Sequence, residues 1–269
     1  MELKSTIRAY AKVNWHLAVG CKKEDGYHPI SSLFQLCSLY DELEISISEG
    51  PFEIEVLGLE GLCEKGCSTV DKAAVLWHQE TGFDKKITVK ITKNIPSQAG
   101  LGGGSSDAAS LLFYLNSIDD QPMSIEKLMQ MGAKVGCDVP FFVSQAKAAY
   151  VMGLGEIVMP IKAKPLKGFI IVSDSEKVST KQAYQALDTR TVIPELDTKE
   201  ELLKEYEKPY KDWSFRNDFD MVNTRPQIQI GEGEKLMLTG SGSCYVLLTE
   251  RVNIKIEGSR AIEVCFLAD

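Results

Sequence analysis

The chain has 269 residues, of which 44% are hydrophobic and 25% are charged, and its formal net charge is −8. This composition is typical of a globular protein with one large domain or two ordinary ones. The acidic balance argues against nucleic-acid binding, because a nucleic-acid-binding surface must be basic to displace counterions from phosphates. An anionic small molecule remains an acceptable ligand, since the local field of a pocket can oppose the global charge.

The seven cysteines are scattered along the sequence and form no C-x-x-C motif. Cys63 and Cys67 are the nearest pair, and they lack the second pair or the histidines that would complete a zinc site. Residues 1–20 contain neither the apolar run of a signal peptide or membrane anchor nor the Arg/Ser richness of a transit peptide. We therefore expect reduced thiols, a cytoplasmic location and no membrane partner.

The first half of the chain alternates strand and helix patterns. Residues 6–20 are rich in β-branched and aromatic side chains, and alternating apolar residues predict further strands over 41–49 and 86–92. Helical spacing predicts helices over 70–82 and 124–136, each ended by a glycine, where helices commonly stop.

The second half continues with strand signals and fewer helices. We expect, in chain order, a strand and turn over 148–161, a strand over 168–175, a charged helix over 198–210 that Pro209 stops, a strand, turn and strand over 235–248, and a last strand over 261–269. Together with the first half, these elements predict an α+β fold with two lobes, 1–150 and 151–269. A cleft between lobes is a common place for a ligand.

A glycine-rich loop, NIPSQAGLGGGSSDAASLL, occupies residues 94–112 between a predicted strand and a predicted helix. Ser105 or Ser106 is expected to cap that helix. The free amides of a helix N-terminus attract phosphate, and glycines let the backbone approach it closely. The loop has no P-loop lysine, and no V-A-I-K segment follows it as in protein kinases. The sequence thus predicts a phosphate site, with a flexible or purely structural loop as the alternative.

Two charged residues lie in apolar surroundings. Asp138 precedes the segment VPFF, where it either caps or turns the chain or accepts a proton from a substrate hydroxyl. Lys12 lies inside an apolar strand, where it either extends to solvent or keeps a buried carboxylate ionised.

Two short turns complete the candidate segments. EDGYHPISSLF carries a turn at Asp25 and Gly26, followed by Tyr27 and His28, and a surface hairpin is the simpler interpretation of it. LTGSGSCYVL is a second glycine–serine turn between strands, and it could equally be a tight hairpin.

Taken together, these segments resemble the GHMP kinases, the superfamily of galactokinase, homoserine kinase and mevalonate kinase. PSQAGLGGGSSDAA is similar to the central phosphate-binding motif of that superfamily, and LTGSGSCYVL is similar to its C-terminal glycine motif. AKVN, DGYH, GCDVPFF and RNDFD narrow the resemblance to the GHMP kinases that act on 4-diphosphocytidyl-2-C-methyl-D-erythritol. These motifs occur in the family's order from residue 9 to residue 244.

The resemblance implies an activity and a role for each site residue. Such a kinase uses ATP to phosphorylate the 2-hydroxyl of its substrate in the non-mevalonate route to isoprenoid precursors. Asp138 would then be the base, and Lys12 would hold it ionised and orient the hydroxyl. The implied ATP-binding residues are Pro96, Gly100, Leu101, Gly102, Gly103, Gly104, Ser105 and Ser106. The implied substrate-binding residues are Asn14, Tyr27, His28, Thr180, Tyr184, Gly240, Ser241 and Gly242.

Within that site, Tyr27 and His28 would bind the cytosine by stacking and by reading its edge, and Tyr184 would close the other face of the base. Mg²⁺ is expected with ATP, and Ser106 is its plausible ligand. The sequence departs from the family's pattern at Trp15, His16 and Gln98. Residues 185–215 match no motif. The alternatives are another GHMP kinase, of the homoserine or mevalonate type, and a nucleotide sensor without catalysis.

Overall fold

The computed structural model describes residues 3–173, 179–190, 193–223, 225–252 and 254–269. The chain divides into two compact units that interleave along the sequence. Unit 1 comprises Met1–Ala11, Leu39–Ser97 and Gly102–Ala146, and unit 2 comprises Lys12–Ser38, Gln98–Leu101 and Lys147–Asp269. The contiguous domains 1–150 and 151–269 stay a prediction.

Unit 1 contains a mixed sheet. Its strands are β3 (Glu53–Leu57), β4 (Lys86–Thr92) and parts of β1 (Leu3–Val19) and β2 (Ile30–Ser48). β4 runs antiparallel to β2, with Ile45 opposite Val89, and β3 runs parallel to β4. Alternate residues of β2 and β4 are buried, Leu43, Ile45 and Ile47 on one strand and Ile87, Val89 and Ile91 on the other. This alternation is the pattern that predicted both strands.

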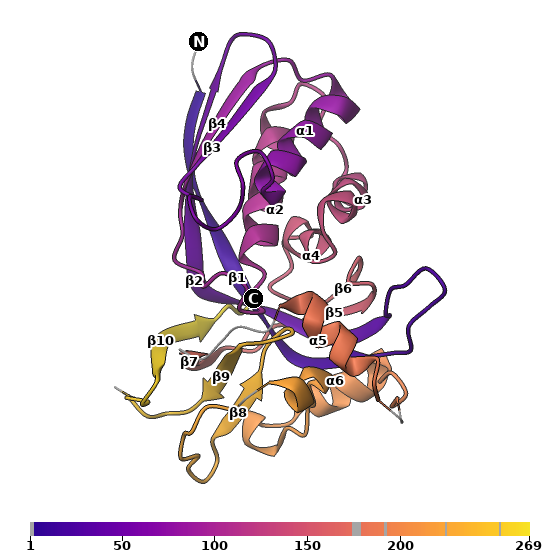
Figure 1. Cartoon of the computed structure of the whole chain (residues 1–269), viewed down its shortest axis with the longest axis vertical. Helices are drawn as coiled ribbons and strands as arrows, with labels where there is room; N and C mark the ends of the chain where they lie inside the picture. The colour runs from indigo at the N-terminus through magenta and orange to yellow at the C-terminus, as the bar shows by residue number, and fades with distance from the viewer. Residues whose placement is uncertain (1–2, 174–178, 191–192, 224, 253) are drawn as a thin grey trace. The chain divides into compact units, whose positions relative to one another are not determined.

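Four helices lie against one face of this sheet (Figure 1). They are α1 (Thr69–Thr81), α2 (Gly103–Ile118), α3 (Ile125–Val135) and α4 (Val139–Val143). α1 begins with a capping box of Ser68 and Asp71, and it ends at Gly82, which adopts a left-handed φ of 73°. α3 begins at a serine cap and also stops at a glycine, but Gly136 is extended. Both predicted helices are confirmed.

Unit 2 contains an antiparallel sheet in the order β10-β7-β9-β8. These strands are β7 (Leu166–Ser173), β8 (Lys235–Leu238), β9 (Cys244–Leu248) and β10 (Ser259–Phe266). Phe266 of β10 pairs with Cys37 of β2. β2 also pairs with β5 (Ala148–Gly153), which pairs with β6 (Ile157–Ile161).

The helices of unit 2 are short. They are α5 (Thr180–Leu187), α6 (Lys199–Glu207) and the 3₁₀ helices η1 (Tyr210–Asp212) and η2 (Asp218–Val222). Trp15, one of the departures from the family's pattern, packs between the rings of Trp213 and Phe266 at 5.4 and 4.6 Å. Its indole nitrogen donates to Gln35. Trp15 therefore belongs to an aromatic core of unit 2.

The strands predicted in the second half are present, with shifted ends. The strand predicted over 168–175 is β7, and residues 174 and 175 lie outside the described residues. β2 begins at Ile30, well before the predicted start at residue 41. The alternation of apolar and polar residues did not reveal this earlier part, because residues 30–35 are buried on both faces of the sheet. Within the ranges given above, every helix is too short or too polar to cross a bilayer.

Candidate active site

The glycine loop leads into the N-terminus of α2. Gly102 precedes the helix with a left-handed φ of 70°, and no side chain caps the helix. The expected cap by Ser105 or Ser106 is wrong, because both serines lie inside the first turn. The Ser106 hydroxyl instead donates to the Tyr10 carbonyl at 2.7 Å. Since no side chain caps the helix, its N-terminus offers amides to an anion.

A buried ionic cluster adjoins this turn. Lys93 donates to Asp41 and, at 2.9 Å, to Asp107 in α2. The second oxygen of Asp41 accepts the amides of Asn94 and Ile95 at 2.6 and 2.8 Å. A β-carbon on Gly103 would lie 3.2 Å from the Lys93 ammonium. Asp41 and Lys93 thereby fix the backbone that leads into the loop.

Burial raises the pKa of Asp107 to about 7, although the Lys93 ammonium opposes this shift. One oxygen of Asp107 has no hydrogen-bond partner among the described residues. Sequence reasoning missed this cluster. The available signal was an aspartate directly after the two serines, at a helix position that faces the core.

In unit 2, the AKVN segment binds the second glycine turn. Lys12 is 3% exposed, which excludes an extension to solvent. Its ammonium donates to Asn14 Oδ1 at 2.7 Å and lies 4.4 Å from the centre of the Phe34 ring. Asn14 Oδ1 also accepts the Gly240 amide at 3.0 Å. Lys12, Asn14 and the turn therefore form one hydrogen-bonded group.

The second glycine turn also contacts the glycine loop, and the contact is between backbone atoms of the two segments. The amide of Lys12 donates to the Leu101 carbonyl at 3.0 Å. Gly100 and Gly240 have φ of 74° and 58°, and a β-carbon on Gly100 would lie 2.9 Å from the Gly240 Cα. A side chain at either position would overlap the other backbone. Gln98, one of the departures named above, also adopts a left-handed φ of 56°.

Two further asparagines hold the second glycine turn. Asn217 of RNDFD donates to the carbonyls of Leu238 and Gly240 at 3.0 and 2.9 Å. Asn223 donates to the carbonyls of Ser241 and Phe219 at 3.0 and 2.9 Å. The turn is the hairpin connection between β8 and β9, as the simpler interpretation predicted, and it is also bound by other segments of unit 2.

The DGYH segment forms a turn that presents its aromatic residue to solvent. The Tyr27 amide donates to Asp25 Oδ1 at 2.9 Å, and the tyrosine is 59% exposed. His28 is buried, and both its ring nitrogens have partners. Nδ1 lies 3.0 Å from the Gly20 carbonyl and Nε2 lies 3.0 Å from Asp188.

α5 contributes the other predicted residues of the substrate site. The Thr180 hydroxyl lies 3.1 Å from that of Ser241. The Tyr184 ring lies 5.2 Å from the His28 ring and 5.0 Å from the Phe219 ring. The structure therefore brings Tyr184 to His28 and Thr180 to the glycine turn.

Asp138 precedes α4 in unit 1 and is partly exposed, directly before the buried residues of VPFF. Its side chain makes no cap hydrogen bond to α4, so of the two structural alternatives the cap is absent and the turn stays open beside the base. Residues 102–106 and Pro96 also belong to unit 1, whereas Lys12, Asn14, Gly100 and Leu101 belong to unit 2. The pairing of Asp138 with Lys12 stays a prediction.

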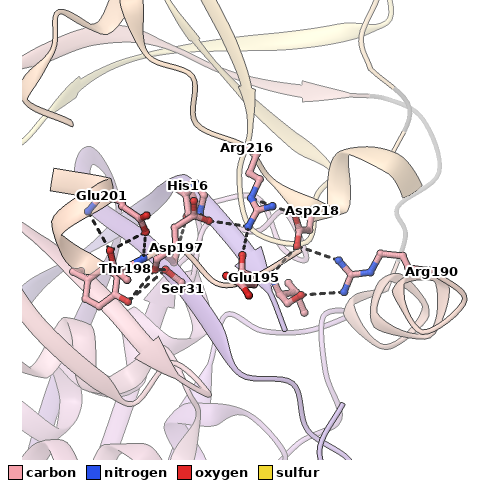
Figure 2. Close-up of polar contacts among 12 residues, drawn as sticks. His16, Ser31, Arg190, Glu195, Asp197, Thr198, Glu201, Arg216 and Asp218 are labelled. Atoms are coloured by element: carbon pink, nitrogen blue, oxygen red, sulfur yellow. Dashed lines mark hydrogen bonds and ion pairs between the residues drawn. The ribbon is translucent and has the colours of Figure 1, made fainter. Parts of the chain in front are cut away.

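A charged network in unit 2 surrounds His16 (Figure 2). Arg216 donates to Asp197 at 2.7 Å and to the Glu195 carbonyl at 2.8 Å. His16 is 2% exposed, and its Nε2 lies 3.1 Å from Asp197, too poorly aligned for a hydrogen bond. Burial lowers the pKa of His16 to about 4, although the Asp197 carboxylate opposes this shift.

We expect this histidine to make the protein sensitive to mild acid. His16 is protonated below about pH 6.5 in the unfolded chain but only below about 4 in the folded one, so folding stability falls as pH decreases through this window. At pH 5 the loss from His16 is about 2 kcal/mol. His16→Phe should remove this loss, measured by urea unfolding at pH 7 and pH 5. Equal losses in the variant and the unchanged protein would contradict the assignment.

The sequence model described as GHMP kinases N terminal domain matches residues 68–146. A 4-diphosphocytidyl-2-C-methyl-D-erythritol kinase of Chlorobium phaeobacteroides (strain BS1) is 33% identical over 227 residues, which cover 81% of this chain and 72% of the relative. The chain belongs to the 4-diphosphocytidyl-2-C-methyl-D-erythritol kinase family. A kinase of the same name from Ruthia magnifica subsp. Calyptogena magnifica is 40% identical over 182 residues, 68% of this chain and 63% of the relative.

The fold agrees with this membership. A crystal structure of 4-(cytidine 5'-diphospho)-2C-methyl-D-erythritol kinase superimposes with a TM-score of 0.73 and 26% identity, over 97% of this chain and 99% of that one. The predicted α+β fold of the GHMP kinases is therefore confirmed. The matches to the first curated relatives span only 63% to 66% of their own lengths.

Proposed function

We propose that this chain is an ATP-dependent kinase that phosphorylates the 2-hydroxyl of 4-diphosphocytidyl-2-C-methyl-D-erythritol, in the non-mevalonate route to isoprenoid precursors. The observation that carries the proposal is the buried group of Lys12, Asn14 and the Gly240 amide. It joins two motifs of the family, AKVN and the second glycine turn. We place the enzyme in the cytoplasm as part of the same proposal.

The glycine loop is the proposed ATP site. Residues 102–104 carry no side chain that could block a phosphate, and the N-terminus of α2 is uncapped. The residues present therefore fit a triphosphate. ATP supplies the transferred phosphoryl group, and this chain positions it.

Mg²⁺ is part of the proposal as a partner of ATP. Within the described residues no group of three or more histidine, cysteine, aspartate or glutamate side chains could hold a metal ion. Mg²⁺ in kinases is bound largely by phosphates and water, with one or two protein ligands, so such a group is not required. The Ser106 hydroxyl, which donates to the Tyr10 carbonyl, keeps lone pairs for this purpose.

Phosphoryl transfer needs a base for the substrate hydroxyl and little other covalent chemistry. Asp138 is the proposed base. Lys12 is the proposed cation that keeps this carboxylate ionised and orients the hydroxyl. Asn14 fixes the Lys12 ammonium through the 2.7 Å hydrogen bond, so that the lysine is oriented before substrate arrives.

Cytosine is the proposed ligand of Tyr27, His28 and Tyr184. The exposed Tyr27 ring is available for stacking. Both ring nitrogens of His28 already have protein partners, so the backbone of His28 is the proposed reader of the base edge. Gly240, Ser241 and Gly242 are proposed to border the diphosphate or the methylerythritol end.

Tyr27→Ala is expected to raise the KM for the cytidine substrate about tenfold, because base–aromatic stacking contributes roughly 1–3 kcal/mol. The kcat should change little, since the ring does not touch the reacting atoms. The KM for ATP is the internal control. An unchanged KM for the substrate would remove Tyr27 from the site.

The function is tested by coupled ADP release with Mg-ATP and 4-diphosphocytidyl-2-C-methyl-D-erythritol, with homoserine, mevalonate and galactose as parallel acceptors. Turnover with the cytidine compound alone is the expected result. Turnover with another acceptor would keep the ATP loop and discard the cytosine site. ATP binding without any turnover would favour the sensor.

A further inference from the structure

The His28 ring is held between two acceptors. Nδ1 faces the Gly20 carbonyl, which only accepts hydrogen bonds, so Nδ1 carries a hydrogen. On the other side, Nε2 lies 3.0 Å from Asp188. The ring is buried to 6% exposure of its side chain, and its orientation is therefore set by these two contacts.

Asp188 reaches His28 because of its register on α5. Thr180, Tyr184 and Asp188 are spaced by four residues, so their side chains follow one face of the helix. The first lies against Ser241, the second against the His28 ring, and the third against His28 Nε2. One helix face thus contacts both parts of the proposed substrate site.

The end of α5 is itself fixed to β1. Arg190 donates to the Leu187 carbonyl at 3.1 Å and to the Val19 carbonyl at 3.0 Å. It also binds Asp218 at 3.0 Å, as Figure 2 shows. Asp218 in turn accepts the Val19 amide at 2.8 Å. These contacts therefore hold the backbone at Asp188 next to Gly20, which is the other partner of His28.

We propose that Asp188 is a positioning residue for cytidine-nucleotide recognition: it fixes the His28 ring and, through it, the backbone that reads the base. This inference rests on the proposed function, because it assigns the ligand of His28 to a cytidine nucleotide. Asp188 touches no substrate atom in this scheme. It acts by holding His28 and Tyr27 in a binding-ready arrangement.

The test compares three variants of the full chain. Asp188→Ala removes the contact, and Asp188→Asn keeps an amide whose oxygen can accept a hydrogen bond from Nε2 and whose nitrogen can donate one to it. Lys22→Met is the matched control, because Lys22 binds the other oxygen of the same carboxylate at 2.9 Å. Each protein is titrated with CDP by calorimetry, and KM is measured separately for the cytidine substrate and for ATP.

We expect Asp188→Ala to weaken CDP binding and raise the substrate KM about tenfold, with kcat changed less than twofold and the KM for ATP unchanged. Asp188→Asn should recover most of the affinity, and Lys22→Met should stay within twofold of the unchanged protein. CDP affinity of the alanine variant within twofold of the unchanged protein would overturn the inference. A parallel loss of kcat and of ATP affinity would do the same, since it indicates a general structural role.

Failure of the proposed function is distinguishable. If the unchanged protein binds no CDP and does not use the cytidine substrate, the assignment of the cytosine site is wrong. The inferred role of Asp188 is then wrong as well. If the unchanged protein binds CDP and all three variants bind it equally, only the role of Asp188 is wrong. Because the Asp188 side chain is 30% exposed, these variants are expected to fold.

Discussion

Asp138→Asn is expected to reduce kcat by a factor of about 10³ while the protein stays folded and still binds ATP. The reason is that asparagine keeps the shape of the side chain and loses the basicity that accepts the hydroxyl proton, and a positioned base contributes roughly 10²–10⁴ in rate. Asparagine is nearly isosteric with aspartate, and the Asp138 side chain makes no cap hydrogen bond to α4 that the substitution could remove. The measurement is single-turnover phosphoryl transfer, together with calorimetric titration of ATP.

Asp120→Asn is the matched control, because it removes the same charge from an exposed residue of the same unit. The control should keep full turnover, which separates a local role from a change in net charge. A rate for Asp138→Asn within tenfold of the unchanged protein would show that another group takes the proton. A loss of ATP binding in parallel would place Asp138 in the nucleotide site instead.

Gly100→Ala is expected to lower the free energy of unfolding by about 4 kcal/mol. The added β-carbon would lie 2.9 Å from the Gly240 Cα and would overlap the Thr239 carbonyl, and neither backbone can move without breaking the turn. Left-handed backbone strain contributes roughly 1–2 kcal/mol of this loss, and overpacking contributes about 1–3 kcal/mol more. Urea unfolding measures the sum.

The control for this prediction is Gly258→Ala. Gly258 belongs to the same unit and has a left-handed φ of 64°, but nothing lies within 4 Å of an added β-carbon. Its substitution should cost only the strain, about 1 kcal/mol. Equal losses in the two variants would mean that the close approach of the two glycine segments contributes nothing to stability.

The sequence predicted correctly those parts of the fold in which apolar residues recur at a strict interval or a glycine ends a helix. Ile87, Val89 and Ile91 alternate with polar residues, and the glycine at 82 ends a helix in the left-handed conformation. The start of α2 was predicted wrongly, because the serine-cap rule is local. Here Gly102 takes the residue position before the helix, and the Ser106 hydroxyl donates to the Tyr10 carbonyl instead of capping the helix.

The candidate site was predicted as a set of motifs, and its supporting residues were not. Asp188, Asn217 and Asn223 are separated along the sequence from the segments that they hold. Asn217 lies in the RNDFD motif, but no local pattern indicates which segment it holds, and none distinguishes Asp188 or Asn223 from other polar residues. Only the pairing of β1 with the segment around Asn217, and of α5 with His28, brings them into contact. Such contacts depend on tertiary structure, and the spacing of residues along the sequence does not indicate them.

The interleaving of the two units has a consequence for how the chain is synthesised and dissected. β1 and β2 each belong partly to both units, and Cys37 of β2 pairs with Phe266 near the C-terminus. Unit 2 therefore cannot complete its sheet until residue 266 has left the ribosome. A fragment ending at residue 150 would hold the early strands of unit 2 without β10, whose Phe266 pairs with Cys37. Contacts between residues so far apart in the sequence slow folding, and the strand edge at Cys37 stays unpaired until Phe266 has been synthesised.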